Sequence, residues 1–338
     1  MRILYIPRKP ESRGWQSDLK RNALGLLDGQ DGFFEAALHR AGHVTLRPLD
    51  AVMAMEPAIR ARFDAVVVNA KSDLAWQDAA GATALCALFA RPVALFLGFA
   101  RARFMPANAV LSAYHTVFKR EPYADLGRYD LSARNADKVV PTHLSNPFEP
   151  LSRRFAWGIP PSKPKRMGWD VPTDKDVFFL GKTQEGEHLA RKDSWAKVVA
   201  SGLAARGGLF PRKGYDLPAE LHASHLEKPE YLRQLQASRV NLGLEGIGSF
   251  TFRHLETLWA GSFLLSNPTV PEQRLRAPLI DGEDYVSFQD HDDMIDKIRH
   301  YATHEPERQR IAKNGRRAYE RLHDVLAHAG EIKTALAA

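Results

Sequence analysis

The chain contains little cysteine and no long hydrophobic run, and each absence excludes a class of protein. Its 338 residues include one cysteine, Cys86, so no internal disulfide can form. The longest apolar run, residues 92–100, is far shorter than the roughly 20 residues that a transmembrane helix needs. The opening residues pass directly into charged ones, without the apolar core of a signal peptide. These features predict a cytoplasmic protein, with peripheral membrane association left open.

Several motifs that mark catalytic or metal sites are also missing. The sequence has no Walker A motif, no G-x-S-x-G and no cysteine–histidine spacing typical of zinc sites. Residues 290–292 match a D-x-D metal motif, but they stand at a predicted helix start, which favours an N-cap. Cys86 lies in an apolar stretch and is expected to be a buried, inert thiol. We therefore expect neither a bound metal nor a cofactor.

Acidic residues are fewer than basic ones. The chain has 47 Lys and Arg against 40 Asp and Glu, which gives a formal net charge of +7. This balance suits an anionic partner such as a nucleotide, a nucleic acid or an acidic lipid headgroup. The basic residues are spread along the chain without a run of five. Charge alone therefore does not choose among these partners.

Predicted strands and helices alternate along the chain, the pattern of a parallel sheet covered by helices on both faces. Residues 63–69 and 92–99 are continuous apolar runs, typical of strands that are buried on both faces. Further strands are expected at residues 2–6, 43–46, 116–119, 138–140, 176–180, 240–244, 263–265 and 285–288. Helices are expected at residues 33–41, 79–90, 188–200, 231–238, 251–260, 290–301 and 306–328.

A proline-rich stretch divides this pattern into two halves. Residues 141–172 contain seven prolines, which neither a helix interior nor a central strand tolerates. The length of the chain also fits two medium-sized domains better than one. We predict one doubly wound α/β domain over residues 1–160, a second over residues 161–322, and the end of a terminal helix over residues 323–338.

The most informative stretch is residues 241–265, NLGLEGIGSFTFRHLETLWAGSFLL. It predicts a buried strand, a glycine-rich turn, a helix and a second strand. Gly246 and Gly248 permit a tight turn and a close approach of the backbone to a ligand. Ser249 or Thr251 is expected to cap the helix that follows. A helix that starts at such a turn directs free N–H groups toward it, which predicts an anion site.

Arg253 and Glu256 are three residues apart, so both lie on one face of this helix near its start. An arginine there is suited to holding a phosphate, and a glutamate one turn further on can accept two ribose hydroxyls. The alternative is a solvated surface ion pair worth a few tenths of a kcal/mol.

Residues 246–265 resemble the C-terminal signature of GT-B-fold glycosyltransferases. Their pattern is G-x-G-S-x-T-x-R-x-x-E-x(4)-G-x-x-L-L, and it is most similar to that of the CgeB-like and exostosin-like groups. The resemblance covers about residues 176–325, and the N-terminal half is similar only in architecture. It implies two Rossmann-like domains facing a cleft, with a C-terminal helix that crosses back. Residues 1–160 would then bind the acceptor and residues 161–322 the nucleotide-sugar donor.

The resemblance also implies roles for single residues. Glu256 aligns with the glutamate that holds the donor ribose, and Arg253 with the arginine that contacts the diphosphate. The other implied donor-binding residues are Gly246, Gly248 and Ser249 under the phosphates, with Lys182 and Arg191 as a clamp. For Lys182 and Arg191 the alternative is plain surface charge. Many retaining enzymes carry a carboxylate eight positions before the ribose glutamate, where this chain has Gly248, which puts a retaining mechanism in doubt.

A narrower similarity links the chain to phage enzymes that glucosylate hydroxymethylated cytosine in DNA, which share the T-x-R-x-x-E helix. Those enzymes use an aspartate base just after a buried strand, but residues 97–101 of this chain contain no carboxylate. The base must therefore come from elsewhere in the N-terminal half. The candidates near predicted strand ends are His115 and Glu121, with Asp18 and His143 beside them, and each of these is otherwise a cap or a surface residue.

The resemblance implies a glycosyltransferase, for hexosyl or related groups, that uses a nucleotide-diphosphate sugar. Arginine, lysine and a helix dipole would stabilise the leaving diphosphate in place of a metal. The acceptor is left open among a saccharide, a lipid-linked glycan, a protein and modified DNA. Two alternatives remain: a DNA glycosyltransferase that acts on hydroxylated bases, and a nucleotide-sugar-binding protein or epimerase of the same fold.

Overall fold

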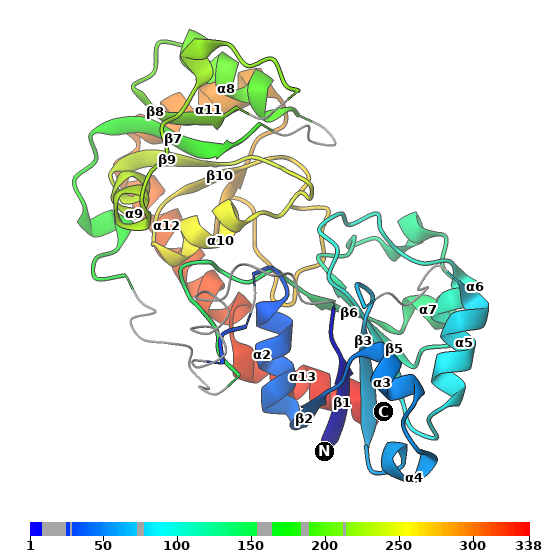
Figure 1. The fold of residues 1–338 in the computed structure, drawn as a ribbon. Helices are drawn as coiled ribbons and strands as arrows, with labels where there is room; N and C mark the ends of the chain where they lie inside the picture. The colour runs from blue at the N-terminus through cyan, green and yellow to red at the C-terminus, as the bar shows by residue number, and fades with distance from the viewer. Residues whose placement is uncertain (9–24, 28, 73–77, 154–163, 184–188, 212–213) are drawn as a thin grey trace. The chain divides into compact units, whose positions relative to one another are not determined.

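A computed structural model describes residues 1–8, 25–27, 29–72, 78–153, 164–183, 189–211 and 214–338 (Figure 1). The chain forms two compact units. Unit 1 comprises Met1–Ser162, Arg274–Arg276 and Asp324–Ala338. Unit 2 comprises Lys163–Gln273 and Ala277–His323. The C-terminal segment therefore returns to the unit in which the chain begins.

Unit 1 is built on a parallel sheet of six strands in the order β2-β1-β3-β4-β5-β6. Every residue of β3, β4 and β5 is buried, as expected for strands with helices on both faces. The strands are β1 (Arg2–Ile6), β2 (His43–Leu46), β3 (Ala65–Asn69), β4 (Val93–Leu97), β5 (Thr116–Arg120) and β6 (Val139–Thr142).

Two hydrophobic cores flank this sheet. One packs helices α2 and α13 against one face, and the other packs α5 and α6 against the opposite face (Figure 1). The helices of unit 1 are α2 (Gly32–Ala41), α3 (Leu49–Met53), α4 (Pro57–Arg60), α5 (Ala79–Ala87), α6 (Asn108–Leu111), α7 (Ala133–Ala136) and α13 (Val325–Ala337). Because α13 lies beside α2, the terminal helix crosses back as the resemblance implied.

Unit 2 contains a parallel sheet of five strands in the order β11-β10-β9-β7-β8. Its strands are β7 (Lys175–Lys182), β8 (Ala205–Phe210), β9 (Ser238–Gly243), β10 (Leu264–Ser266) and β11 (Val286–Ser287). Helices α8 (Arg191–Ala200) and α11 (His291–Thr303) cover one face, and α9 (Lys228–Gln236), α10 (Phe252–Trp259) and α12 (Glu305–Leu322) lie on the other (Figure 1). The two sheets confirm the predicted pair of Rossmann-like folds.

Several elements differ from expectation, among them the short helices α3, α4, α6 and α7, which were not predicted. Strand β8 was not predicted, because Gly207 and Gly208 interrupt its apolar pattern and adopt φ values of 102° and 140°. The single helix expected over residues 306–328 ends at Leu322, and Asp324 caps a new helix by accepting bonds from two backbone N–H groups. Strand β6 includes Pro141, which fits because β6 is an edge strand.

The residues at the D-x-D motif behave as an N-cap. The Asp290 side chain accepts hydrogen bonds from the backbone N–H groups of Asp292 and Asp293 at the start of α11. The capping alternative is therefore confirmed. Within the described ranges, no group of three or more His, Cys, Asp or Glu side chains converges in a way that could hold a metal ion.

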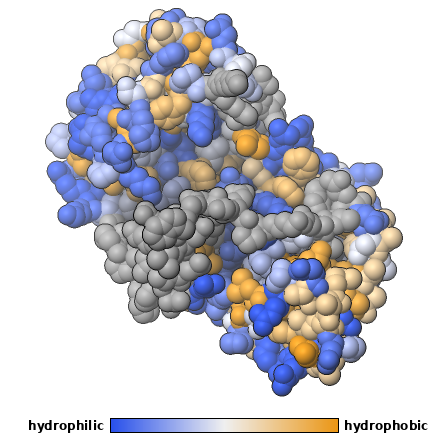
Figure 2. All heavy atoms as spheres, viewed as in Figure 1, coloured by the Kyte–Doolittle hydropathy of each residue, from blue (hydrophilic) through white to orange (hydrophobic). Residues whose placement is uncertain are grey.

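Hydrophilic residues dominate much of the surface in view, and apolar residues gather mainly on the side of unit 1 that carries α5 (Figure 2). Large exposed apolar side chains such as Met53, Phe104 and Ile247 occur on separate elements. Scattered apolar residues of this kind are normal for a protein surface. Of the helices in the described part of the chain, none has the length and apolar character to span a bilayer.

Candidate functional site

The residues predicted from the glycine-rich stretch meet at the carboxyl ends of β7 and β9 in unit 2. The chain leaves β7 toward β8 on one side and returns to β9 on the other side, so this is the point where the strand order reverses. Ligands of open α/β sheets bind at such reversal points. Residues 244–251, which connect β9 to α10, and the first turn of α8 both lie at this edge.

Glu256 is buried on α10, and its position is fixed by two neighbours. The Tyr231 hydroxyl, from the first turn of α9, donates a hydrogen bond to Glu256 Oε2 at 2.6 Å. The Arg253 Nη1 atom lies 3.6 Å from the same oxygen. Burial raises the pKa of Glu256, and the charge of Arg253 opposes that shift. The pair is therefore enclosed and oriented, unlike the solvated surface pair that was the alternative.

Arg253 is enclosed by aromatic rings. Its guanidinium carbon lies 4.6 Å from the centre of the Tyr231 ring and 5.8 Å from the ring of Phe179, and Nη2 donates to the Leu180 carbonyl. Nε and Nη1 are buried and have no hydrogen-bond partner among the described residues. Burial lowers the pKa of Arg253, while Glu256 raises it. Buried donors without a hydrogen bond are costly, and Nη1 has only its 3.6 Å ion-pair contact with Glu256, so these two N–H groups are candidates to donate to an anionic ligand.

Arg191 contacts the backbone at the ends of two strands, and its predicted role as a phosphate clamp stays a prediction. Its Nε donates to the Glu245 carbonyl at 2.7 Å, Nη1 to the Lys182 carbonyl at 3.1 Å and Nη2 to the Leu244 carbonyl at 3.3 Å. Burial lowers its pKa to about 10, with a contribution from the nearby charge of Arg253. Arg191 therefore braces the ends of β7 and β9 through their backbone. The Lys182 side chain is exposed, and the two residues meet only through the Lys182 carbonyl.

The glycine-rich turn fits closely against this brace. A Cβ atom on Gly246 would lie 2.8 Å from Arg191 Nη2, and the Gly246 N–H donates to the Gly248 carbonyl at 3.0 Å. Gly248 is buried and Ser249 is half-buried. The turn residues are thus at the predicted edge of the sheet, and their phosphate-binding role stays a prediction.

His254 was not singled out from the sequence, yet it holds the start of α10. Its Nδ1 accepts a hydrogen bond from the Thr251 N–H at 3.0 Å, and Nε2 lies 3.0 Å from Ser266 Oγ. This is the arrangement of a capping box in which histidine replaces the usual Glu or Gln. Its position three residues after a threonine was the available signal.

The stability of unit 2 is expected to fall on acidification because of His254. Burial lowers its pKa to about 3, whereas an unfolded histidine has a pKa of about 6.5. The unfolded state therefore binds more protons below pH 6.5, and stability falls by up to about 1.4 kcal/mol per pH unit toward pH 4. Burial also lowers the pKa of His39, on α2 of unit 1, to about 4. Urea unfolding of wild type and His254→Asn across pH 4–8 isolates the contribution of His254 from that of His39, and parallel pH profiles would contradict it.

The structure places the predicted bases of unit 1 at different edges of the sheet and at different depths. His115 precedes β5 and is exposed at the amino edge of the sheet, where it lines a cavity of about 600 Å³. Ligands of such sheets usually bind at the opposite edge, so this position does not favour His115 as a base, and its role stays a prediction. His143 is buried and stacks on Phe33 at 3.9 Å between ring centres. Asp18 lies outside the described residues.

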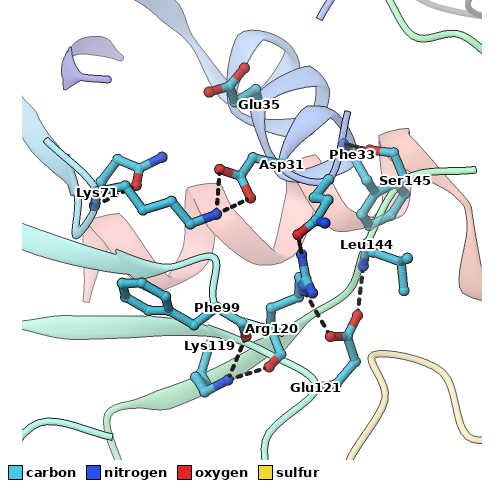
Figure 3. A network of polar contacts seen from close by, with 12 residues as sticks. Asp31, Phe33, Glu35, Lys71, Phe99, Lys119, Arg120, Glu121, Leu144 and Ser145 are labelled. Carbon is cyan, nitrogen blue, oxygen red and sulfur yellow. Dashed lines mark hydrogen bonds and ion pairs between the residues drawn. The ribbon is translucent and has the colours of Figure 1, made fainter. Parts of the chain in front are cut away.

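Glu121 lies at the carboxyl edge of the sheet but is fully enclosed. Its two oxygens accept hydrogen bonds from Arg120 Nε at 2.9 Å and from the Leu144 N–H at 2.7 Å (Figure 3). Its backbone is left-handed, with φ of 40°. Burial raises its pKa, against the charges of Arg120 and Lys119. These contacts make Glu121 a brace between β5 and the end of β6, and its assignment as a base stays a prediction.

One cavity of unit 2 lies at the edge of the sheet away from the predicted site. A cavity of about 290 Å³ is lined by Trp169, Arg239 and Arg308 among others, and it lies where β9 begins. It is therefore at the amino edge, opposite the Glu256 and Arg253 side chains.

Sequence comparison places the second half of the chain near known transferases. Residues 188–333 match the model of a family described as glycosyl transferase-like. No curated protein that was compared matches the chain.

Solved structures match the whole chain. A glycosyltransferase from Rickettsia africae ESF-5 has a TM-score of 0.60 at 9% identity, with 99% of this chain and 98% of that chain covered. Anabaena Alr3699/HepE in complex with UDP has a TM-score of 0.56 at 10% identity, with both chains fully covered. Its fold is GT-B.

The DNA-modifying enzyme β-glucosyltransferase also shares the GT-B fold with this chain, with a TM-score of 0.51 at 10% identity and 99% of each chain covered. The similarity to phage enzymes expected from the T-x-R-x-x-E helix is thus confirmed for the fold. The narrower likeness to CgeB-like and exostosin-like groups is not distinguished by these matches and stays a prediction.

Proposed function

We propose that this chain is a glycosyltransferase that moves a sugar from a nucleotide-diphosphate sugar to an acceptor hydroxyl without a metal. The observation that carries the proposal is the enclosed Arg253 and Glu256 pair at the reversal point of the unit 2 sheet. Two buried N–H groups of Arg253 make no hydrogen bond with the described residues, and Glu256 Oε2 is oriented by Tyr231. Together they offer donors to an anion and acceptors to hydroxyl groups.

The donor-binding chemistry follows from these groups. Glu256 accepts hydrogen bonds from the ribose hydroxyls, and Arg253 donates to the diphosphate. The N-terminus of α10 adds the positive end of its dipole, and the exposed Lys182 adds a mobile charge. As the bond to the sugar breaks, negative charge develops on the diphosphate, and these cationic groups stabilise it in place of a metal.

A uridine nucleotide and a hexosyl group are the first choice of donor, because Anabaena Alr3699/HepE was crystallised with UDP and with UDP and glucose. The proposal includes a cytoplasmic location. The acceptor stays open among a saccharide, a lipid-linked glycan and a protein.

Modified DNA is a second candidate acceptor. The fold is shared with a DNA-modifying β-glucosyltransferase, and the chain carries a net charge of +7. A DNA-acting enzyme binds duplexes with an affinity that falls steeply as salt rises. The absence of duplex binding at low salt would remove this candidate and leave the donor half of the proposal untouched.

A thermal-shift panel tests the proposal. The chain is heated with UDP, UDP-glucose, a GDP-sugar, a dTDP-sugar and a CMP-sugar. A ligand present at 100 times its Kd adds about 2.7 kcal/mol to the free energy of unfolding. We expect UDP and UDP-glucose to raise the melting temperature most. A panel in which no sugar nucleotide stabilises the protein would contradict the proposed function.

A further inference from the structure

A second reversal point lies in unit 1, between β1 and β3. Asp31, immediately before α2, and Lys71, two residues after β3, meet at this carboxyl edge (Figure 3). The Lys71 Nζ atom lies 3.0 Å and 3.1 Å from the two carboxylate oxygens of Asp31. Asp31 and Lys71 are 40 residues apart in the sequence, so no local motif predicts that they form a pair.

The end of β4 is shaped to admit this carboxylate. A Cβ atom on Gly98, the residue after β4, would lie 2.5 Å from Asp31 Oδ1 and 3.0 Å from Lys71 Nζ. Any side chain at position 98 would therefore displace the pair. The Asp31 carboxylate occupies the space beside a strand end that has no carboxylate of its own in residues 97–101.

The two side chains of the pair are buried to different extents. The Asp31 side chain is 3% exposed, whereas that of Lys71 is 21% exposed, so the pair reaches the surface on the lysine side. The Lys71 ammonium also lies 5.6 Å from the centre of the Phe99 ring. Removing a carboxylate and an ammonium from water costs about as much as their attraction returns, so such a pair adds little net stability. Its presence at a reversal point favours a chemical role.

Three other carboxylates among the residues that the structure describes near this edge make structural contacts. Glu121 accepts from Arg120 and from the Leu144 N–H, as described above. Asp78 caps α5 by accepting from two backbone N–H groups. Glu35 accepts a hydrogen bond from the Tyr5 hydroxyl at 2.9 Å. Among the described residues, the side chain that holds the Asp31 carboxylate is that of the partly exposed Lys71.

We infer that Asp31 is the general base of the transfer reaction and that Lys71 positions its carboxylate. The inference rests on the proposed function. An Asp31 oxygen takes the proton of the acceptor hydroxyl as the acceptor oxygen bonds to the anomeric carbon. The bond from that carbon to the diphosphate breaks, and its electron pair leaves on the diphosphate oxygen. Asp31 then returns the proton to water. A single displacement of this kind inverts the anomeric carbon.

Charged and titratable groups of two neighbouring strands, β1 and β5, and of the segment after β1 interact with the pair. Those that interact electrostatically with Asp31 or Lys71 are Tyr5 of β1, Arg8 after β1, Lys119 and Arg120 of β5. Lys71 is the cation that contacts the carboxylate directly. Removing its charge should therefore shift the acidic limb of the pH–rate profile to higher pH, by about 1–3 pH units. A merely structural lysine would leave that limb in place.

The test uses the whole chain and UDP-glucose, or the sugar nucleotide of the panel that stabilises it most. Release of the nucleoside diphosphate with water as the acceptor is measured for wild type, Asp31→Asn, Lys71→Met and the control Glu35→Gln. Asp31→Asn should lower the rate by about 10²–10⁴-fold, with UDP affinity within about twofold of wild type. Glu35→Gln should keep the wild-type rate. NMR of the released sugar should show inversion, so that UDP-α-glucose yields β-glucose.

Each outcome separates the two claims. If no sugar nucleotide binds, the proposed function fails. If the donor binds and Asp31→Asn retains its rate, or the sugar is released with retention, the assignment of Asp31 alone is overturned. A wild type that binds the donor without ever releasing the nucleoside diphosphate also overturns it. If Asp31→Asn does not fold, the Lys71→Met pH profile decides, because an unshifted acidic limb contradicts the role of the pair.

Discussion

Glu256→Gln is expected to weaken UDP binding by about 10–100-fold while the protein stays folded. Each charge-assisted hydrogen bond to a ribose hydroxyl is worth about 1.5–3 kcal/mol, and the amide replaces a carboxylate acceptor by a neutral one. The fold should tolerate the change, because the Tyr231 hydroxyl can still donate to the amide oxygen. Isothermal titration of UDP into wild type and variant measures the ratio of the two dissociation constants.

The chain offers a matched control for this substitution. Glu230 and Arg233 form a pair with the same three-residue spacing on α9, but both side chains are exposed. Glu230→Gln should therefore leave UDP affinity unchanged. If both variants bind UDP like wild type, Glu256 does not contact the nucleotide. If both weaken binding equally, the effect is one of general charge and not of the enclosed site.

Arg191→Met is expected to destabilise unit 2 by about 2–4 kcal/mol. The substitution removes the donor for three backbone carbonyls at the ends of β7 and β9, and an unpaired buried acceptor costs about 1–3 kcal/mol. For a unit of this size, the melting temperature should fall by roughly 5–15 °C. UDP binding should weaken as well, because the turn that contains Gly246 packs against Arg191 Nη2.

Arg299→Met is the matched control, since Arg299 forms an exposed i,i+3 pair with Asp296 on α11. Surface pairs contribute about 0–1 kcal/mol, so its melting temperature should stay close to that of wild type. Calorimetry of the three proteins makes the comparison. A wild-type melting temperature in Arg191→Met would show that Arg191 does not brace the two strands, and would favour its predicted role as a phosphate clamp.

The fold was largely predictable where strands are buried on both faces. Residues 63–69 and 92–99 carry an uninterrupted apolar signal, and β3 and β4 lie within them. The signal fails where backbone conformation replaces side-chain pattern. Strand β8 contains Gly207 and Gly208, which have no side chains to show a periodicity. The break before α13 depends on one cap at Asp324 inside a run of good helix formers.

The candidate site was predictable only where its residues are close in sequence. Gly246, Arg253 and Glu256 belong to one strand–turn–helix, and the structure brings them to one edge of a sheet. The contacts of Tyr231 with Glu256 and of Lys71 with Asp31 join separate elements, and neither has a local pattern.

The position of His115 in the sequence already does not favour a role at the ligand-binding edge. The residue precedes its strand, and parallel sheets bind ligands where strands end.

A crystal structure of the chain with UDP tests the central claim most directly. We predict that the ribose hydroxyls lie within hydrogen-bond distance of Glu256 and that the diphosphate lies beside Arg253 and residues 246–249. Binding in the cavity beside Trp169 at the amino edge of the same sheet, with Glu256 and Arg253 free of ligand, would contradict the account.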